Sequence, residues 1–183
     1  MKIEKTNIPE NSILKTENNF NFIDGYKGNF IDRNNKFEIQ EIGKLFFYTG
    51  PKWIDKLFIF RNKVVKLFGL KTANNISKRQ QQLENFTGQP GEQVGLFKVF
   101  HKTDNEIILG ENDKHLDFRV SLFLESNNVE TNQKELTIST IVKFNNQFGK
   151  IYFLPVRPFH KQIVPTMLKG IIKEINKSEC NVS

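Results

Sequence analysis

The sequence predicts an α+β fold in which a curved antiparallel β-sheet wraps around a long C-terminal helix, with a helix pair near the N-terminal side. Alternating apolar and polar residues separated by short turns fill residues 96–144, which is typical of an antiparallel meander. Helical spacing of apolar residues appears before these strands, in 37–68, and after them, in 149–176. Because such layers leave space between helix and sheet, that space is the first candidate for a binding site.

A length of 183 residues fits one domain, able to bury about 70% of its unfolded surface. Residues 1–20 are polar and Asn-rich, and we expect a loosely packed N-terminal arm there. The domain itself is expected over 21–177, followed by a C-terminal tail over 178–183. Within the domain, residues 72–94 are polar and rich in helix breakers, which predicts an exposed loop.

The first predicted strand covers 26–31, and the first helix covers 37–48 with an apolar stripe that includes Ile39, Ile42 and Phe46. Pro51 suits the first turn of a second helix that ends before Gly69. The second helix is apolar on more than one side, so we expect it to contact the body of the protein on two surfaces.

Four strands follow, and they are expected to form the meander. Their predicted ranges are 96–101, 106–111, 114–124 and 135–144. The C-terminal helix has an apolar stripe that ends near Ile175, and its three prolines are expected to kink or segment it.

Composition excludes several classes of protein. The net charge of +7 comes from lysines spread along the chain, without an Arg-rich helix or an RNA-binding aromatic motif, so nucleic acid is not expected as a partner. A single cysteine, Cys180, excludes an internal disulfide framework and indicates a reducing compartment. The N-terminus lacks the apolar core of a signal peptide or a membrane span. We therefore expect a cytoplasmic protein.

Recognisable catalytic and cofactor motifs are missing from the sequence. It has no CxxC or HExxH spacing for a metal, and neither GxGxxG nor GxxxxGK[ST] for a phosphate. No acyl-transfer triad is apparent, because Ser121 and Ser139 lie on predicted strands. We therefore predict no cofactor and no metal, assign no catalytic residue and leave open whether the protein is an enzyme.

The most distinctive segment is the predicted hairpin at 106–124, because one of its faces carries a charged stripe. Strand alternation separates an apolar set, Leu116, Phe118, Val120, Leu122 and Leu124, from a polar set, His115, Asp117, Arg119 and Ser121. A turn at Asn112-Asp113 would place Gly110 opposite His115, Ile108 opposite Asp117 and Glu106 opposite Arg119, with His101 beside Glu106. The polar face is either the wall of a pocket or a solvated ladder of ion pairs.

Three segments resemble an uncharacterised bacterial family catalogued as domain of unknown function 2867. They are PKWIDKLFIFRNKVVKLFGLK at 51–71, LGENDKHLDFRVS at 109–121 and STIVKFNNQFGKIYFLPVRPFHKQIV at 139–164. The family is similar in layout to the START/Bet v 1 helix-grip (SRPBCC-like) proteins. That likeness implies an apolar ligand held between the sheet and the terminal helix, although a fold does not fix a function. The family label implies no activity, so it supplies no catalytic residues.

Nine residues are candidate ligand contacts. Trp53, Leu57 and Phe60 would line the space between helix and sheet. Arg61, which interrupts the apolar run of its helix, would hold a polar head or else play a structural role. The remaining candidates are the polar hairpin residues His115, Asp117 and Arg119, together with Tyr152 and His160 in the proline-rich start of the last helix.

Three functions follow as hypotheses. The leading one is the binding of a small apolar or amphipathic molecule in a hydrophobic cavity between the sheet and the C-terminal helix. The second is a small-molecule enzyme of the cyclase, isomerase or hydrolase kind that uses the face of His115, Asp117 and Arg119. The third is weak contact with a membrane surface through the basic, apolar helix 51–68. The oligomeric state and the biological process are left open.

Overall fold

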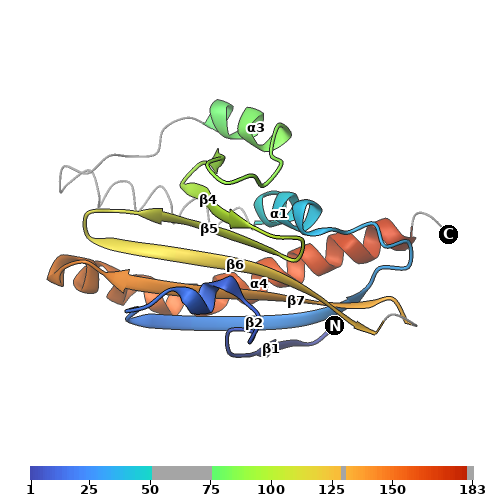
Figure 1. Cartoon of the computed structure of the whole chain (residues 1–183), viewed down its shortest axis with the longest axis horizontal. Helices are drawn as coiled ribbons and strands as arrows, with labels where there is room; N and C mark the ends of the chain where they lie inside the picture. Colours follow the sequence, from blue (N-terminus) through green and yellow to red (C-terminus); the bar gives the residue numbers. More distant parts are fainter. Residues whose placement is uncertain (51–75, 129–130, 181–183) are drawn as a thin grey trace.

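The computed structural model describes residues 1–50, 76–128 and 131–180, and within them the chain forms an α+β fold around one antiparallel sheet. The sheet has seven strands in the order β1-β2-β7-β6-β5-β4-β3 (Figure 1). The strands are β1 (Ile3–Lys5), β2 (Phe22–Ile31), β3 (Gln93–Val94), β4 (Phe97–Lys102), β5 (Glu106–Asn112), β6 (Leu116–Asn128) and β7 (Gln133–Phe144). The helices are η1 (Ile13–Thr16), α1 (Ile39–Tyr48), α3 (Ile76–Glu84) and α4 (Gln147–Cys180).

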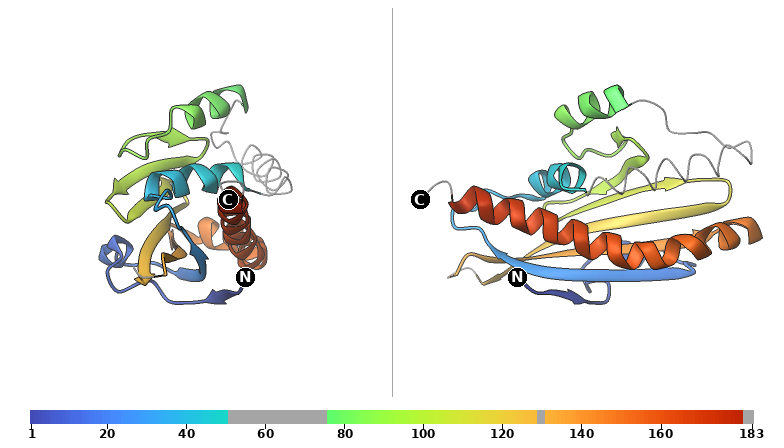
Figure 2. Two further views of the ribbon diagram at one scale, coloured as in Figure 1. Left: turned by 90° about the vertical axis from the view of Figure 1, so that its right-hand side faces the viewer. Right: turned by 180° about the vertical axis from the view of Figure 1, so that it is seen from behind.

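The two faces of the sheet are covered by different parts of the chain. α4 and α1 lie against one face, which we call the helix face, and η1 lies against the other, which we call the arm face (Figure 2). Strand alternation therefore directs Val120, Leu122 and Leu124 of β6 into the main core under α4 and α1. A second, smaller apolar cluster lies on the arm face; it contains Ile8, Leu14, Ile108 and Ile141.

The long helix α4 is continuous through Pro155, Pro158 and Pro165, so the prolines do not segment it. Its axis bends in the proline-containing half (Figure 2), as expected where a ring replaces a backbone N–H donor. Residues Val164, Leu168, Ile171, Ile172 and Ile175 anchor its second half in the main core. At its start Gly149 is needed, because a Cβ there would collide with the carbonyl oxygen of His115 in the β5–β6 turn.

The predicted elements are largely present. The strand expected at 26–31 is the second half of β2, the four meander strands are β4 to β7, and α1 matches the first predicted helix. The N-terminal arm differs from the expectation of loose packing, because β1 pairs with β2 and Leu14 is fully buried. The expected loop at 72–94 contains α3 and β3. The helix predicted over 51–68 lies outside the described residues.

The predicted register of the β5–β6 hairpin is wrong. Gly110 pairs with Arg119, and Ile108 pairs with Ser121, so each β5 residue meets a partner four positions later than expected. The turn covers 113–115 instead of Asn112-Asp113, because the Asp113 side chain accepts a hydrogen bond from the His115 N–H (3.1 Å) and extends the turn. The expected row of His101, Glu106 and Arg119 is therefore absent, since His101 pairs with Ile108.

A buried ion pair closes the end of the sheet near α1. The Lys134 ammonium donates to Asp32 Oδ2 (2.7 Å) and to the Phe37 carbonyl (3.0 Å). Asp32 also accepts the backbone N–H groups of Lys36 (2.8 Å) and Phe37 (3.0 Å). Burial acts to raise the pKa of Asp32, but the three hydrogen bonds to its charged form and the positive charge of Lys134 outweigh it, and the pKa lies below its usual value.

This lowered pKa predicts an acid-sensitive contribution to stability. Because the pKa of Asp32 is lower in the folded than in the unfolded chain, its contribution is fully present above about pH 4, the unfolded value. The contribution is lost as the pH falls below that value and through the folded pKa. Urea unfolding at pH 6 and pH 3 should show a smaller acid-induced loss for Asp32→Asn than for the wild type. An equal loss in both proteins would contradict the prediction.

Candidate functional site

The centre of the candidate site is Asp24, a carboxylate of β2 that points to the helix face. Its partner in the register of β7 is Thr140, whose side chain lies on the same face. Asp24 is only 4% exposed and Thr140 2% exposed. Neither carboxylate oxygen of Asp24 has a hydrogen-bond partner, and the same holds for the Thr140 hydroxyl. Buried polar atoms are normally paired, so this arrangement requires an explanation.

His160 of α4 faces this carboxylate. Its Nδ1 lies 3.7 Å from Asp24 Oδ2, which is close enough for electrostatic attraction but too long for a direct hydrogen bond. Nδ1 is itself buried without a partner. The imidazole ring packs edge-on against Phe22 at a centroid distance of 5.7 Å, which fixes its orientation. Helix α4 and strand β2 therefore bring an imidazole and a carboxylate together inside the protein.

Tyr26 stands on the same side of β2, two residues beyond Asp24. Burial, the negative charge of Asp24 and a hydrogen-bonding contribution from the Asp24 side chain raise the pKa of its hydroxyl. By distance and angle, however, the hydroxyl donates to the Lys161 carbonyl on α4 (3.5 Å), and neither Asp24 oxygen accepts a hydrogen bond. Asp24, Tyr26, Thr140 and His160 together form what we call the Asp24 cluster.

The Asp24 cluster offers mainly hydrogen-bond acceptors within an apolar layer. Phe153, which packs edge-to-face against Phe22 at a centroid distance of 4.9 Å, is buried next to the cluster, and the main core lies farther along α4. A buried acceptor that lacks a donor costs roughly 1–3 kcal/mol, and more when it is charged. The arrangement is therefore suited to receive a donor group, such as a hydroxyl or an amine, or to share a proton between carboxylate and imidazole.

The predicted hairpin residues lie elsewhere and make other contacts. His115 is in the β5–β6 turn, where its Nδ1 contacts the Asn146 side chain (3.2 Å to the amide oxygen). Asp117 accepts from the backbone N–H of Asp113 (3.2 Å) and from Asn145 (3.0 Å). Both side chains thereby join the turn to the start of α4 and do not approach the Asp24 cluster.

Arg119 lies on the arm face, where it is hydrogen-bonded to neighbouring backbone and side-chain groups. It donates to the Phe118 carbonyl (2.8 Å) and to Asn112 Oδ1 (2.7 Å), and its guanidinium lies 3.7 Å above the Phe100 ring. Burial lowers the pKa of Arg119, while the charge of Glu17, 3.6 Å away, acts in the opposite direction. The enzyme hypothesis requires the Arg119 face to point into a cavity under α4, and the arm face points away from α4.

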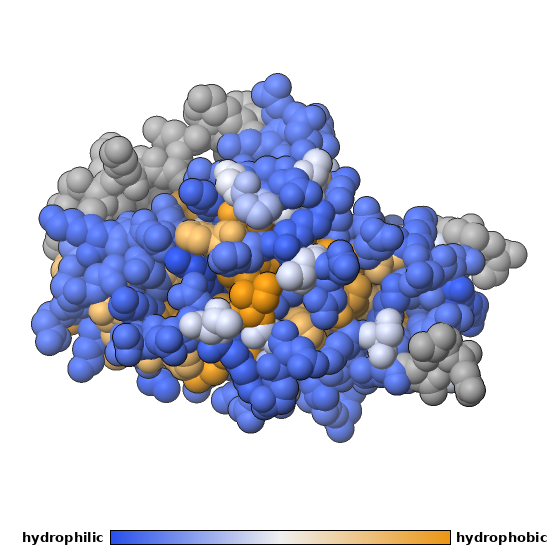
Figure 3. Space-filling view, viewed as in Figure 1, coloured by the Kyte–Doolittle hydropathy of each residue, from blue (hydrophilic) through white to orange (hydrophobic). Residues whose placement is uncertain are grey.

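The arm face also contains a buried acid, Glu106, which is 1% exposed. Its Oε1 accepts the hydroxyls of Ser12 and Ser121, both at 2.5 Å, and its Oε2 accepts the Ile13 N–H at 2.7 Å. Every one of these donors belongs to the arm or the sheet, so Glu106 fastens the arm to the sheet. Most of the surface on this side is hydrophilic, with a narrow hydrophobic band (Figure 3).

Of the other predicted ligand contacts, two lie on α4 and four fall outside the described residues. His160 lies in the Asp24 cluster, and Tyr152 is half-buried on α4, two turns before it. Trp53, Leu57, Phe60 and Arg61 lie outside the described residues, so the cavity that they would line stays a prediction.

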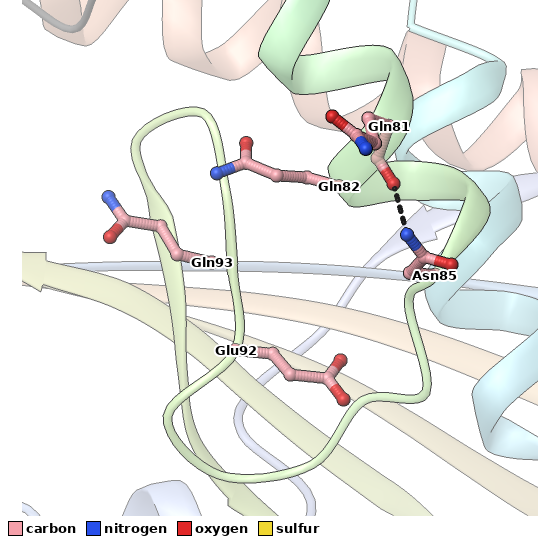
Figure 4. A pocket seen from close by; sticks show the side chains of 5 residues that line it. All are labelled: Gln81, Gln82, Asn85, Glu92 and Gln93. Carbon is pink, nitrogen blue, oxygen red and sulfur yellow. Dashed lines mark hydrogen bonds between the residues drawn. The ribbon is translucent and has the colours of Figure 1, made fainter.

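Among the described residues, an open hollow of about 440 Å³ lies between α3 and β3, and the residues that line it are of polar types (Figure 4). It is lined by Gln81, Gln82, Asn85, Glu92 and Gln93. The Asn85 amide donates to the Gln81 carbonyl (3.1 Å), and the Glu92 carboxylate is occupied by the N–H groups of Thr87 and Gly88, both at 2.9 Å. Its polar groups are therefore largely satisfied within the protein.

The described residues include no group of three or more side chains suited to hold a metal ion. Within the same ranges, no helix has both the length and the apolar character needed to cross a membrane.

Sequence reasoning missed Asp24 and Thr140. A signal was present: in FIDGYKGNFI, one side of the strand presents Phe22, Asp24, Tyr26, Gly28 and Phe30, so a carboxylate interrupts an aromatic face. The strand predicted from the sequence begins only at Tyr26, so Asp24 falls outside it, whereas β2 begins at Phe22.

Comparison with known proteins gives one family match. The model of a family described as "Protein of unknown function (DUF2867)" matches residues 17–167, which include β2, the meander and the first half of α4. No curated protein and no solved structure matches the chain significantly.

Proposed function

Since the chain belongs to the DUF2867 family, whose function is unknown, we propose a function from its geometry: it binds a small amphipathic molecule between the sheet and α4. The observation that carries this proposal is the pair of unpaired carboxylate oxygens of Asp24 on the helix face. Interiors rarely retain such a costly group unless it has a role.

The arrangement of elements supports the proposal. The long helix α4 crosses the sheet between its second and third strands, β2 and β7, and α1 covers β5 and β6 beside it. This order of elements, with helices after the first long strand, an antiparallel meander and a long terminal helix, is similar to that of helix-grip proteins. Those proteins hold their ligands between the sheet and the terminal helix, and Asp24 of this chain points to the face of the sheet that α4 covers.

The chemistry of the Asp24 cluster indicates which end of a ligand would lie there. A carboxylate, a hydroxyl and an imidazole that lack partners favour a donor head, a hydroxyl or an amine, over a carboxylate head. The neighbouring rings of Phe22 and Phe153 would accommodate an apolar body. We therefore propose an apolar molecule with a hydroxyl or amine head.

Replacing Asp24 by asparagine should stabilise the protein while weakening ligand binding. The change removes a buried carboxylate whose oxygens accept no hydrogen bond but keeps the side-chain shape, so the free energy of unfolding should rise by roughly 1–3 kcal/mol. Urea unfolding of ligand-free protein measures this rise. Asp104→Asn, which removes an exposed carboxylate in the β4–β5 turn, is the matched control and should change stability little. A marked loss of stability in Asp24→Asn would indicate a structural carboxylate instead.

Binding itself is tested by native mass spectrometry of the purified protein, followed by extraction under denaturing conditions. The proposal expects an added mass in the wild type and in Asp104→Asn that is reduced in Asp24→Asn. Titration with long-chain alcohols and amines, read by a shift in Tm, extends the test to ligands lost during purification. Absence of any added mass, together with no Tm shift on titration, would overturn the proposal.

A second candidate, a small-molecule enzyme, is favoured by the approach of His160 Nδ1 to Asp24 (3.7 Å). A carboxylate beside Nδ1 orients an imidazole so that its other nitrogen acts as a general base. This version places the proton-transfer groups under α4 instead of at His115, Asp117 and Arg119. A His160→Gln variant that retains the ligand mass, but no longer converts it, would distinguish an enzyme from a binding protein.

A further inference from the structure

The first half of α4 carries an apolar stripe on its solvent side. Its members are spaced at i, i+3, i+4, i+7 and i+8, so they share one side of the helix; they are Ile151, Leu154, Pro155, Pro158 and Phe159. Ile151 is 63% exposed, Leu154 60% and Phe159 45%. We call this set the α4 stripe.

Contact with the sheet does not explain the α4 stripe, because the opposite side of the same helix already provides that contact. Phe153 is 6% exposed and Val164 5% exposed, and both face the interior. His160 and the Lys161 carbonyl also face β2 from this opposite side. This half of α4 is therefore apolar on two sides, and only one of them is used by the described fold.

The charges beside the stripe have one sign. Lys150, Arg157 and Lys161 lie along one flank of it, and all three are exposed. From Gln147 to Lys173, α4 contains no Asp or Glu, and its first acid is Glu174. The exposed part of α4 thus combines bulky apolar side chains with uncompensated positive charge, and the whole chain has a net charge of +7.

We propose that the α4 stripe and its basic flank form a contact surface for an anionic lipid membrane. Moving aliphatic side chains out of water is favourable when the partner offers an apolar environment. The boundary between headgroups and acyl chains of an anionic bilayer offers such an environment next to negative charge. A nucleic acid would use the basic flank but would leave Ile151 and Leu154 in water. The first turns of α4 also lie at one end of the molecule, beyond the tip of β7, where a flat surface can reach them (Figures 1 and 2).

The test is cosedimentation of the full chain with vesicles at low salt. Vesicles of phosphatidylserine and phosphatidylcholine should bind the wild type, and vesicles of phosphatidylcholine alone should bind it at least tenfold more weakly. Replacing Ile151 and Leu154 by serine should weaken binding to the anionic vesicles about tenfold or more. These side chains are exposed, so an unchanged circular dichroism spectrum and Tm should accompany the loss.

The charge component is tested with two matched triple variants. Glutamine at Lys150, Arg157 and Lys161 should reduce binding strongly, because each basic residue near an anionic surface contributes roughly fivefold in affinity. Glutamine at Lys169, Lys173 and Lys177, which lie on the second half of the same helix, removes the same charge and should reduce binding much less.

Several outcomes would overturn the inference. They are the absence of binding to anionic vesicles at low salt, equal losses in both triple variants, and retention of binding when Ile151 and Leu154 are replaced. Tight binding of a single-stranded oligonucleotide that depends on Lys150, Arg157 and Lys161, without vesicle binding, would assign the basic flank to nucleic acid. The ligand mass of the Asp24 site is measured separately, so failure of one proposal leaves the other standing.

Discussion

Replacing Lys134 by methionine is expected to lower the free energy of unfolding by about 3–5 kcal/mol, because it leaves the Asp32 carboxylate buried without its cation. Lys134 is 8% exposed and Asp32 1% exposed, so water reaches neither group to compensate for the loss. The Phe37 carbonyl also loses its donor. Urea unfolding at pH 7 measures the change.

Two further variants show whether the isolated charge is the cause. In the double variant Asp32→Asn/Lys134→Met the uncompensated charge is gone, so much of the lost stability should return. Lys27→Met breaks the partly exposed pair with Glu135 (3.1 Å) and should cost no more than about 1 kcal/mol. A similar small loss for Lys134→Met would contradict the account given for the buried pair.

Replacing Glu106 by alanine should release the N-terminal arm and lower the free energy of unfolding by about 3 kcal/mol or more, given roughly 1–3 kcal/mol for each buried donor that loses its partner. Three donors lose their acceptor at once, namely the Ser12 and Ser121 hydroxyls and the Ile13 N–H. The arm would then be held by the β1–β2 pairing, by the Glu17–Arg119 ion pair and by the packing of Ile8 and Leu14 on Ile108 and Ile141.

The release of the arm can be followed directly by limited digestion with trypsin. Cleavage after Lys15, in η1, should become faster in Glu106→Ala, while the rates of cleavage at the other sites stay as in the wild type. Glu10→Ala removes an exposed carboxylate of the same arm that pairs with Lys15, and it is the control expected to leave the digestion rate nearly unchanged. Equal protection of Lys15 in wild type and Glu106→Ala would show that the other contacts of the arm hold it without Glu106.

The face of the sheet to which a strand residue points could be predicted from sequence more securely than the residue with which it pairs. Alternation along β6 correctly separates Leu122 from Ser121, because a strand has a period of two and the two classes of side chain differ sharply. The hairpin register depends on the turn, and one side-chain hydrogen bond from Asp113 was enough to lengthen it. The partners moved by four positions, an even number, so every side chain kept its face while its neighbours changed.

The candidate site was harder to predict for a related reason. Asp24 and Thr140 are ordinary strand residues in sequence, 116 positions apart, and only the pairing of β2 with β7 makes them neighbours. His160 was among the expected ligand contacts, but its partner could not be named until α4 was placed over β2. Which face of the sheet α4 covers also decides that Arg119 is remote from the site, and both faces carry apolar residues.

The pairing of β2 with β7 also sets the order in which the chain can assemble. Phe22 meets Val142, and Ile31 meets Gln133, so the edge of β2 opposite β1 must wait for a partner made more than a hundred residues later. At usual rates of protein synthesis that wait lasts roughly 5–25 s. Strands β4 to β7 are hairpin neighbours that can pair as they emerge, whereas β2 is a long-range closure of the kind that slows folding. An aromatic strand exposed during this interval is most vulnerable to aggregation or chaperone capture, and the charge of Asp24 near its start would oppose premature association.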